Sequence, residues 1–420
     1  MRTVSVRRHV FANRTFALLA VGQTCSNTGM WISLFAVSFA IKTITESDLQ
    51  LGLVALVRAA PLIGFSLVGG GLADRVDRRR LLLLTQPAAA VMLAVLALAF
   101  LFGAPEGALV ALLYLVTFGI GALGAFDVPA VQASVPTIVG RADLVQALGV
   151  LVLARQVSSI VAPAVAGVVI GQAGYSAVFG LAAAMYLVFI MLLRVIRWRS
   201  LPESRQRRSL AGAIAEGLRY AWSTPVVLGL LLMDFVATTF AQPSAFVIII
   251  GRDVLNLEPA QIGVLASGFP LGAIVGGAAL GLLSSRLLPT LRAIVIATVI
   301  YGMGVILLGL APSFGVAIVA LVLMGIADVV SETLRNGLLQ LSVPDELRGR
   351  VSSVMLIFVR GGPNLGQFRA GAVASVVGPV ASAVSGGILC VAGTLLLGAW
   401  LARRLRQSPP PFAASARDQR

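Results

Sequence analysis

Apolar stretches of about 20 residues recur along the whole chain and are separated by short polar breaks. A bilayer core is ~30 Å thick, and a helix needs about 20 apolar residues to cross it. Hydrophobic residues make up 58% of the 420 residues and charged residues only 12%, which is unlike any soluble domain. Helices bond every main-chain polar group internally, and the alternation typical of barrel strands is absent. The sequence therefore predicts an all-α polytopic membrane protein.

Hydropathy predicts twelve membrane spans. They cover residues 15–41, 50–72, 81–103, 107–133, 146–170, 176–196, 225–250, 259–283, 293–311, 314–341, 351–377 and 380–401.

Basic side chains are distributed unevenly between the predicted loops. The net charge is +15, which in a soluble protein would suggest nucleic acid binding. If both termini are cytoplasmic, 25 of the 32 basic residues lie in cytoplasmic segments or, like Arg194, at the cytoplasmic end of a span. Five lie deeper within spans, and only Lys42 and Arg252 lie in outer loops. This asymmetry follows the positive-inside rule. We therefore predict cytoplasmic termini, contact with a lipid bilayer and no nucleic acid partner.

Residues that catalyse reactions or bind metals are scarce. The single lysine, Lys42, follows Ile41 and cannot belong to a phosphate-binding G-x-x-x-x-G-K-[ST] loop. The single histidine, His9, leaves no material for histidine-based zinc sites or nucleophile pairs. We therefore predict that the protein is not an enzyme, hydrolyses no ATP and binds neither cofactor nor metal. We also expect it to be a monomer.

Two parts of the chain repeat. The Q-x-S-V-P pattern of Gln132–Arg141 returns in Gln340–Arg350, at an offset of 208 residues. Such internal repeats indicate two similar six-helix halves. We predict an N-terminal bundle over 1–197, a cytoplasmic linker over 198–224, a C-terminal bundle over 225–402 and a cytoplasmic tail over 403–420.

The loop after span two reads GGGLADRVDRRRLLL. Twelve spans in two halves, with a G-x-L-A-D-R-x-x-R-R-R loop between spans two and three, resemble the major facilitator superfamily. The resemblance implies two pseudo-symmetric six-helix bundles and a cytoplasmic latch at this loop. The implied gating residues are Gly71, Asp74, Arg75, Asp77 and Arg78. Asp77 stands where the superfamily usually has glycine, and we expect it to pair with Arg75 or Arg80.

Further motifs narrow the resemblance. FDVPAVQASVPTIVGRADLVQA follows span four, SVPDELRGRVSS follows span ten, PAQIGVLASGFPLGAIVGG lies in span eight and RRLRQSPPP lies in the tail. Together they resemble the enterobactin exporter group of bacterial siderophore exporters. One departure is span five, where Ala162 and Ala166 replace glycines of the exporter signature Gly-Pro-x-x-Gly-Gly. The resemblance implies export from the cytoplasm across the bacterial inner membrane, with a catecholate siderophore such as enterobactin as substrate.

Charged side chains inside the spans are the candidates for transport chemistry, because each costs at least ~2.5 kcal/mol to insert. Asp328, Glu332 and Arg335 share one face of span ten. Burial in an apolar medium favours the neutral form of a carboxyl group, and a nearby arginine favours the ionised form. Arg335 follows Glu332 by three residues and is expected to hold it ionised.

Asp234 is the acidic residue of span seven, and its near polar neighbours in that helix are Thr238 and Gln242. We predict a proton-coupled exporter in which Asp234, Asp328 and Glu332 are the candidate proton carriers. Asp234 and Asp328 rank above Glu332.

A polar and aromatic stripe on span one, together with buried arginines, suits an acidic or catecholic substrate. The predicted substrate-binding residues are Gln23, Asn27, Trp31, Phe35, Arg58, Arg155, Arg360 and Asn364. Trp31 and Phe35 are equally consistent with ordinary packing, and the arginines with interhelical ion pairs. Arg369 is rotated away from Arg360 and is expected to extend outward to the membrane surface.

The repeat places Asp127 opposite Arg335, which suits a gating pair between the halves. Alternatively, Asp127 pairs with arginines of the loop after span two. Three other functions remain open: a multidrug or macrolide exporter of the same branch, a nutrient importer, and a membrane receptor or assembly factor.

Overall fold

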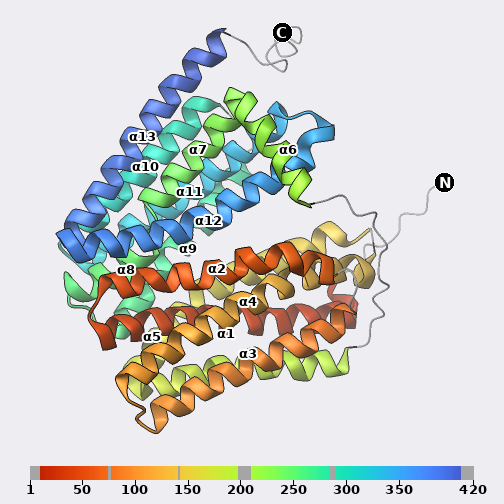
Figure 1. Cartoon of the computed structure of the whole chain (residues 1–420), viewed down its shortest axis with the longest axis vertical. Coiled ribbons are helices and arrows are strands. Elements are labelled where there is room, and N and C mark those ends of the chain that lie inside the picture. Colours follow the sequence, from red (N-terminus) through yellow and green to blue (C-terminus); the bar gives the residue numbers. More distant parts are fainter. Residues whose placement is uncertain (1–9, 74–76, 141, 197–209, 284–289, 408–420) are drawn as a thin grey trace. The chain divides into compact units, whose positions relative to one another are not determined.

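The computed structural model describes residues 10–73, 77–140, 142–196, 210–283 and 290–407. This part of the chain is built from helices and contains no strand (Figure 1). The prediction of an all-α protein is confirmed.

The helices are long and joined by short turns. In the first half of the chain they are a 3-10 helix (Val10–Ala12), α1 (Arg14–Thr45), α2 (Asp48–Ala73), α3 (Arg78–Leu101), α4 (Glu106–Val139) and α5 (Leu144–Val195). The second half contains α6 (Leu210–Ser223), α7 (Pro225–Phe240), α8 (Pro243–Asp253), α9 (Pro259–Leu283), α10 (Leu291–Gly309), α11 (Phe314–Ser342), α12 (Asp345–Val377) and α13 (Pro379–Gln407).

Ten segments of the described chain are long and apolar enough to cross a membrane. One of them is α5, whose 52 residues break at Gly174, where φ is 77°, a left-handed conformation that glycine adopts without a steric penalty. Its two parts correspond to two predicted spans. Another is the 29-residue segment Pro225–Asp253, formed by α7 and α8. α12 is not among the ten, yet its 33 residues are long enough to cross a bilayer core.

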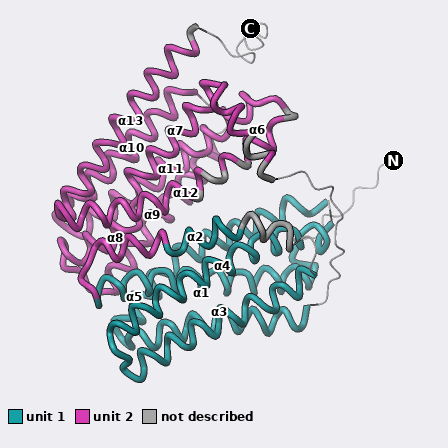
Figure 2. Tube along the Cα trace, in the orientation of Figure 1, with its two compact units in different colours: residues 1–44, 57–205 teal, residues 45–56, 206–420 magenta. Residues whose placement is uncertain are grey.

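Contacts divide the chain into two compact units (Figure 2). Unit 1 comprises Met1–Ile44 and Val57–Arg205, and unit 2 comprises Thr45–Leu56 and Gln206–Arg420. α2 is therefore shared, because its first turns pack within unit 2. There a Cβ on Gly371 of α12 would lie 2.2 Å from the Asp48 carbonyl oxygen, so only glycine fits.

In unit 1, α3 packs mainly on α5 and α4. Leu19 from α1, Leu82 from α3 and Phe189 from α5 form part of a buried apolar cluster. Gly22 leaves room for the Phe189 ring, because a Cβ on residue 22 would lie 2.2 Å from a ring carbon. Apolar side chains thus fill the space between these three helices.

In unit 2, α9 and α11 are packed closely through glycines. A Cβ on Gly272 would lie 2.1 Å from the Val322 carbonyl oxygen, and one on Gly276 would lie 2.9 Å from the Ile326 Cα. Gly325 plays the same role on α11, since a Cβ added there would lie 2.0 Å from a main-chain oxygen of α9. Small residues at four-residue spacing let helix backbones approach in a membrane, where packing must replace the hydrophobic effect.

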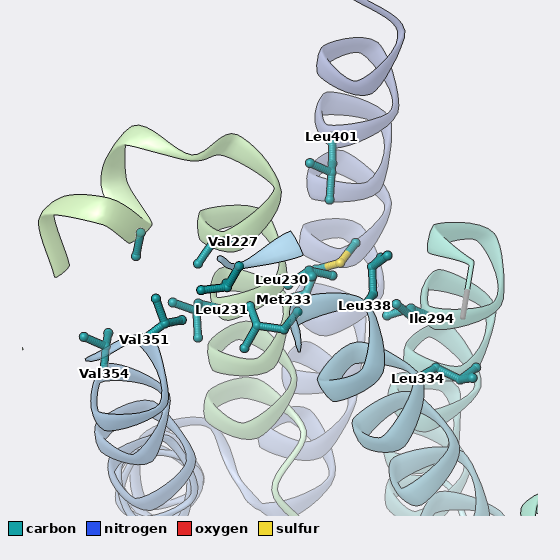
Figure 3. Packing of buried hydrophobic residues seen from close by; sticks show 13 residues of the cluster. Val227, Leu230, Leu231, Met233, Ile294, Leu334, Leu338, Val351, Val354 and Leu401 are labelled. Carbon is teal, nitrogen blue, oxygen red and sulfur yellow. The ribbon is translucent and has the colours of Figure 1, made fainter. Parts of the chain in front are cut away.

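Unit 2 also contains a buried apolar cluster, formed by side chains from several helices (Figure 3). Leu230, Leu231 and Met233 come from α7, and Leu334 and Leu338 come from α11. The charged side chains described next lie beside this cluster.

Candidate transport site

A buried ion pair joins α7 to α11 in unit 2. Arg335 donates through Nη2 to Asp234 Oδ1, and each residue is only 6% exposed. Its Nη1 donates to Ser331 Oγ over 3.1 Å, and Ser331 Oγ lies 2.7 Å from Thr298 Oγ1 of α10. Polar contacts thus link α7, α11 and α10.

The start of α7 determines how deeply Asp234 lies. Thr224 precedes the helix and Pro225 occupies its first turn, where the missing N–H costs nothing. Asp234 is nine residues further on, ~14 Å along the axis. A lone charge at this depth would be costly, and the guanidinium of Arg335 offsets that cost.

The structure changes the expected partner of Arg335. The sequence suggested Glu332 of the same helix or Asp127 of the repeated half, whereas the acid that Arg335 binds among the described residues is Asp234. Asp234 and Arg335 belong to different helices, so spacing along one helix did not indicate the pair. A gating contact between Asp127 and Arg335 stays a prediction.

Asp328 and Glu332 are half-buried on α11. They precede Arg335 and so lie further from the C-terminal end of the helix. The charges of Glu332, Arg335 and Asp234 all act on the Asp328 carboxyl group. Tyr301 of α10 lies within electrostatic reach of Asp234 and Asp328. The three predicted acids therefore gather around one arginine in a single unit.

The stripe on α1 divides into two kinds of residue. Gln23 donates through Nε2 to Asn27 Oδ1 over 3.2 Å. Gln23 Oε1 and the Trp31 indole N–H are buried and have no hydrogen-bond partner within the described chain. Phe35 is buried and stacks on Phe39, with ring centroids 6.0 Å apart. Gln23 and Trp31 therefore keep polar atoms for a ligand, whereas Phe35 is a packing residue.

Asp127 on α4 is held by α3 in unit 1. Thr85 Oγ1 donates to one carboxylate oxygen and Gln86 Nε2 to the other, the latter over 2.8 Å. Gln86 Oε1 in turn accepts a hydrogen bond of 2.9 Å from Ser26 Oγ on α1. These partners replace the loop arginines that the sequence suggested. Thr85 and Gln86 were missed, although two adjacent polar residues in an apolar span were a usable signal.

The other predicted substrate-binding residues are scattered. Arg58 on α2 is half-buried, and its charge acts on Tyr186 of α5. Arg155 on α5 is exposed, and Asn364 on α12 is half-buried. Arg360 is in α12, but its side chain lies outside the described part of the structure.

Asp77 of the loop motif is the N-cap of α3. Its Oδ1 accepts from the main-chain N–H groups of Arg79 and Arg80, over 2.8 and 3.4 Å. The contact with Arg80 is thus made by the amide rather than by the expected guanidinium. Gly71 lies in α2, and Asp74 and Arg75 fall outside the described residues.

Two arginines of the motif bind carbonyl groups inside unit 1. Arg78, only 6% exposed, donates to the Ala133 carbonyl of α4 over 2.6 Å. Arg79 donates to the Leu193 carbonyl of α5 over 3.0 Å. Cations near a helix C-terminus are favoured by the helix dipole, which suits Arg79 at the end of α5. Together the two contacts tie α3 to α4 and α5.

Replacing Asp77 by alanine is expected to destabilise the start of α3 by about 1 kcal/mol, because two N–H groups lose their acceptor. Glycine, the commoner residue here, should cost only a few tenths of a kcal/mol. Hydrogen exchange at the amides of Arg79 and Arg80 measures the effect. Equal exchange in the wild type and the Asp77→Ala variant would contradict the capping role.

Arg369 does not extend outward to the membrane surface, as the sequence suggested. Instead, it donates to the Phe240 carbonyl over 2.7 Å and to the Ser382 carbonyl over 2.9 Å. Its guanidinium also lies 5.6 Å from the centre of the Phe240 ring. Because α7 ends at Phe240 inside a membrane span, its last carbonyls need donors, and Arg369 supplies one.

Comparison with known proteins agrees with this architecture. The family described as transmembrane secretion effector matches residues 9–416. The chain belongs to this family. It is thus a multi-pass membrane transporter of the major facilitator superfamily, and its relatives are transporters rather than enzymes.

Relatives named Enterobactin exporter EntS support the predicted branch. Those of Escherichia coli O1:K1 and of Escherichia coli O127:H6 are each 30% identical to the chain over 419 residues, which is 99% of the chain and 97% of the relative.

Two solved structures share the fold. A bacterial homologue of the human lysosomal transporter Spinster aligns with a TM-score of 0.75 and 16% identity, covering 97% of this chain and all 100% of its own. A bacterial homologue of the iron transporter ferroportin gives a TM-score of 0.71 and 14% identity, covering 93% and 98%. At these identities the likeness concerns the fold alone.

Proposed function

We propose that the protein exports a catecholate siderophore of the enterobactin type from the cytoplasm in exchange for protons. The bacterial inner membrane and cytoplasmic termini are part of this proposal. Similarity to enterobactin exporters along nearly the whole chain supports the substrate class. The observation that carries the coupling is the buried pair of Asp234 and Arg335.

Proton binding to Asp234 would neutralise the acid and remove its attraction for Arg335. An arginine left buried without a counter-ion is costly, so protonation favours an arrangement in which Arg335 finds other partners. The charged and titratable groups near Asp234 are Arg335 and Asp328 of α11 and Tyr301 of α10. Asp328, with Glu332 beside it, is the second candidate to hold the proton.

A catechol suits the free polar atoms on α1. Its hydroxyl groups donate and accept hydrogen bonds, which matches Gln23 Oε1 and the Trp31 indole N–H. Its aromatic ring can also stack on an indole. Arg58, Arg155, Arg360 and Asn364 stay candidates for contacts with the acidic parts of the substrate.

Export against a gradient is the test. Inside-out membrane vesicles with an acidic lumen are expected to concentrate enterobactin when they hold the wild-type protein. The Asp234→Asn variant should fail to concentrate it but still exchange labelled for unlabelled enterobactin, because an amide cannot carry the proton. Glu258→Gln, a change at an exposed acid of unit 2, is the control and should behave as wild type.

Two results would contradict the proposal. Normal accumulation by the Asp234→Asn variant, with normal dependence on the pH difference, would remove Asp234 from the mechanism. Accumulation of macrolides but not of enterobactin by the wild type would replace the siderophore with a drug as substrate.

A further inference from the structure

Two buried oxygen atoms beside the ion pair have no donor. Asp234 uses Oδ1 to bind Arg335, and its Oδ2 has no hydrogen-bond partner among the described residues. The same is true of Oδ1 of Asn336, the residue next to Arg335 on α11. A buried acceptor without a donor costs about 1–3 kcal/mol, so both oxygens call for a ligand that donates.

Both residues line one small cavity. Its lining consists of Leu230, Leu231, Asp234, Arg335, Asn336, Leu339 and Met355. It leaves about 10 Å³ for the centre of a water-sized sphere, close to the least that a single water molecule needs. A cavity of this size with only apolar walls would stay dry, but two acceptors make it suitable for water.

The position of the cavity along the helices indicates where it leads. Leu230 and Leu231 precede Asp234 by about one turn, towards the start of α7 at Pro225. Leu339 follows Arg335 by about one turn, towards the end of α11 at Ser342. The cavity therefore lies between the ion pair and the ends of these helices nearest the segment that joins the two halves.

The charged groups of the lining indicate which kind of ligand fits the cavity. Arg335 and Asp234 both belong to the lining, and their opposite charges leave little net attraction for a metal cation. A neutral molecule with two O–H donors can serve both acceptors at once. Water meets these requirements of size, charge and donor number.

We propose that one water molecule bridges Asp234 Oδ2 and Asn336 Oδ1 and passes the proton between Asp234 and the cytoplasmic side. This inference rests on the proposed function, in which Asp234 carries the proton. In the neutral acid the Oδ2–H group donates to the water oxygen, and the water donates to Asn336 Oδ1. On release, the Oδ2 proton moves to the water oxygen while the water gives the proton of its other O–H group, the one not donated to Asn336, to solvent water on the cytoplasmic side. The O–H electron pair stays on Asp234. Asn336 is thus a positioning residue.

The test compares proton release from Asp234 in the wild type and in Asn336→Leu, which has a similar volume but no acceptor. The infrared band of the protonated carboxyl group, assigned by its loss in Asp234→Asn, is followed after a jump to high pH in the full protein in lipid. Release is expected to slow by about tenfold or more in Asn336→Leu. Enterobactin affinity and exchange should be unchanged. Leu339→Ile alters the same wall without removing an acceptor and should release as fast as wild type.

The outcomes separate the two proposals. If the band is present and Asn336→Leu releases the proton at the wild-type rate, the water relay is overturned while Asp234 stays the carrier. If no band belongs to Asp234, the proposed coupling fails and the relay fails with it. Should Asn336→Leu not fold, Asn336→Ala removes the same acceptor without adding bulk, and wild-type release there would equally overturn the relay.

Discussion

Replacing Arg335 by alanine is expected to lower the free energy of unfolding by about 3–5 kcal/mol, because it leaves the Asp234 carboxylate buried without a counter-ion. Both residues are only 6% exposed, so water cannot stand in for the lost guanidinium. The change also removes the donor to Ser331 Oγ. Denaturant unfolding of the protein in mixed micelles, monitored by helical circular dichroism, measures the loss.

A double variant tests the origin of this loss. Asp234→Asn combined with Arg335→Gln replaces the two charges by neutral groups that can still bond to each other. Most of the stability should return, because no uncompensated charge is buried. Export against a gradient should stay absent. Wild-type stability of the Arg335→Ala single variant would show that Asp234 and Arg335 do not form a charged pair in the folded protein.

Replacing Gly272 by alanine is expected to destabilise the protein by about 3 kcal/mol, the upper end of the range for overpacking. Its new Cβ would lie 2.1 Å from the Val322 carbonyl oxygen and 2.8 Å from the carbonyl carbon. Main chain cannot turn aside as a flexible side chain does, so α9 and α11 must separate. The same unfolding measurement reports the loss.

Gly277 provides a matched control one residue beyond the contact with α11 at Gly276. A Cβ there would meet only Val329 Cγ1, at 3.8 Å, which is ordinary van der Waals contact. Gly277→Ala should therefore be neutral or stabilise by up to about 1 kcal/mol through helix propensity. Equal losses at Gly272 and Gly277 would mean that close packing of the helices is not what Gly272 provides.

Two features of the site were predictable because they depend on composition and order along one helix. Charged residues in apolar spans are rare and costly, and this alone singled out Asp234, Asp328 and Arg335. The cap at Asp77 was equally available from its place just before the apolar run of α3, and the ion pair with Arg75 stays a prediction.

The sequence by itself determined that this protein is a helical membrane protein, where its helices begin and end to within about six residues, and which charged side chains lie inside them. Hydropathy and helical period are local quantities and report these properties directly. The tertiary structure decided which of these side chains meet. Asp234 finds Arg335 101 positions away, Gln86 links Ser26 to Asp127, and Arg369 caps α7. Periodicity shows which residues share a face of one helix, but the packing of helix on helix determines which faces meet.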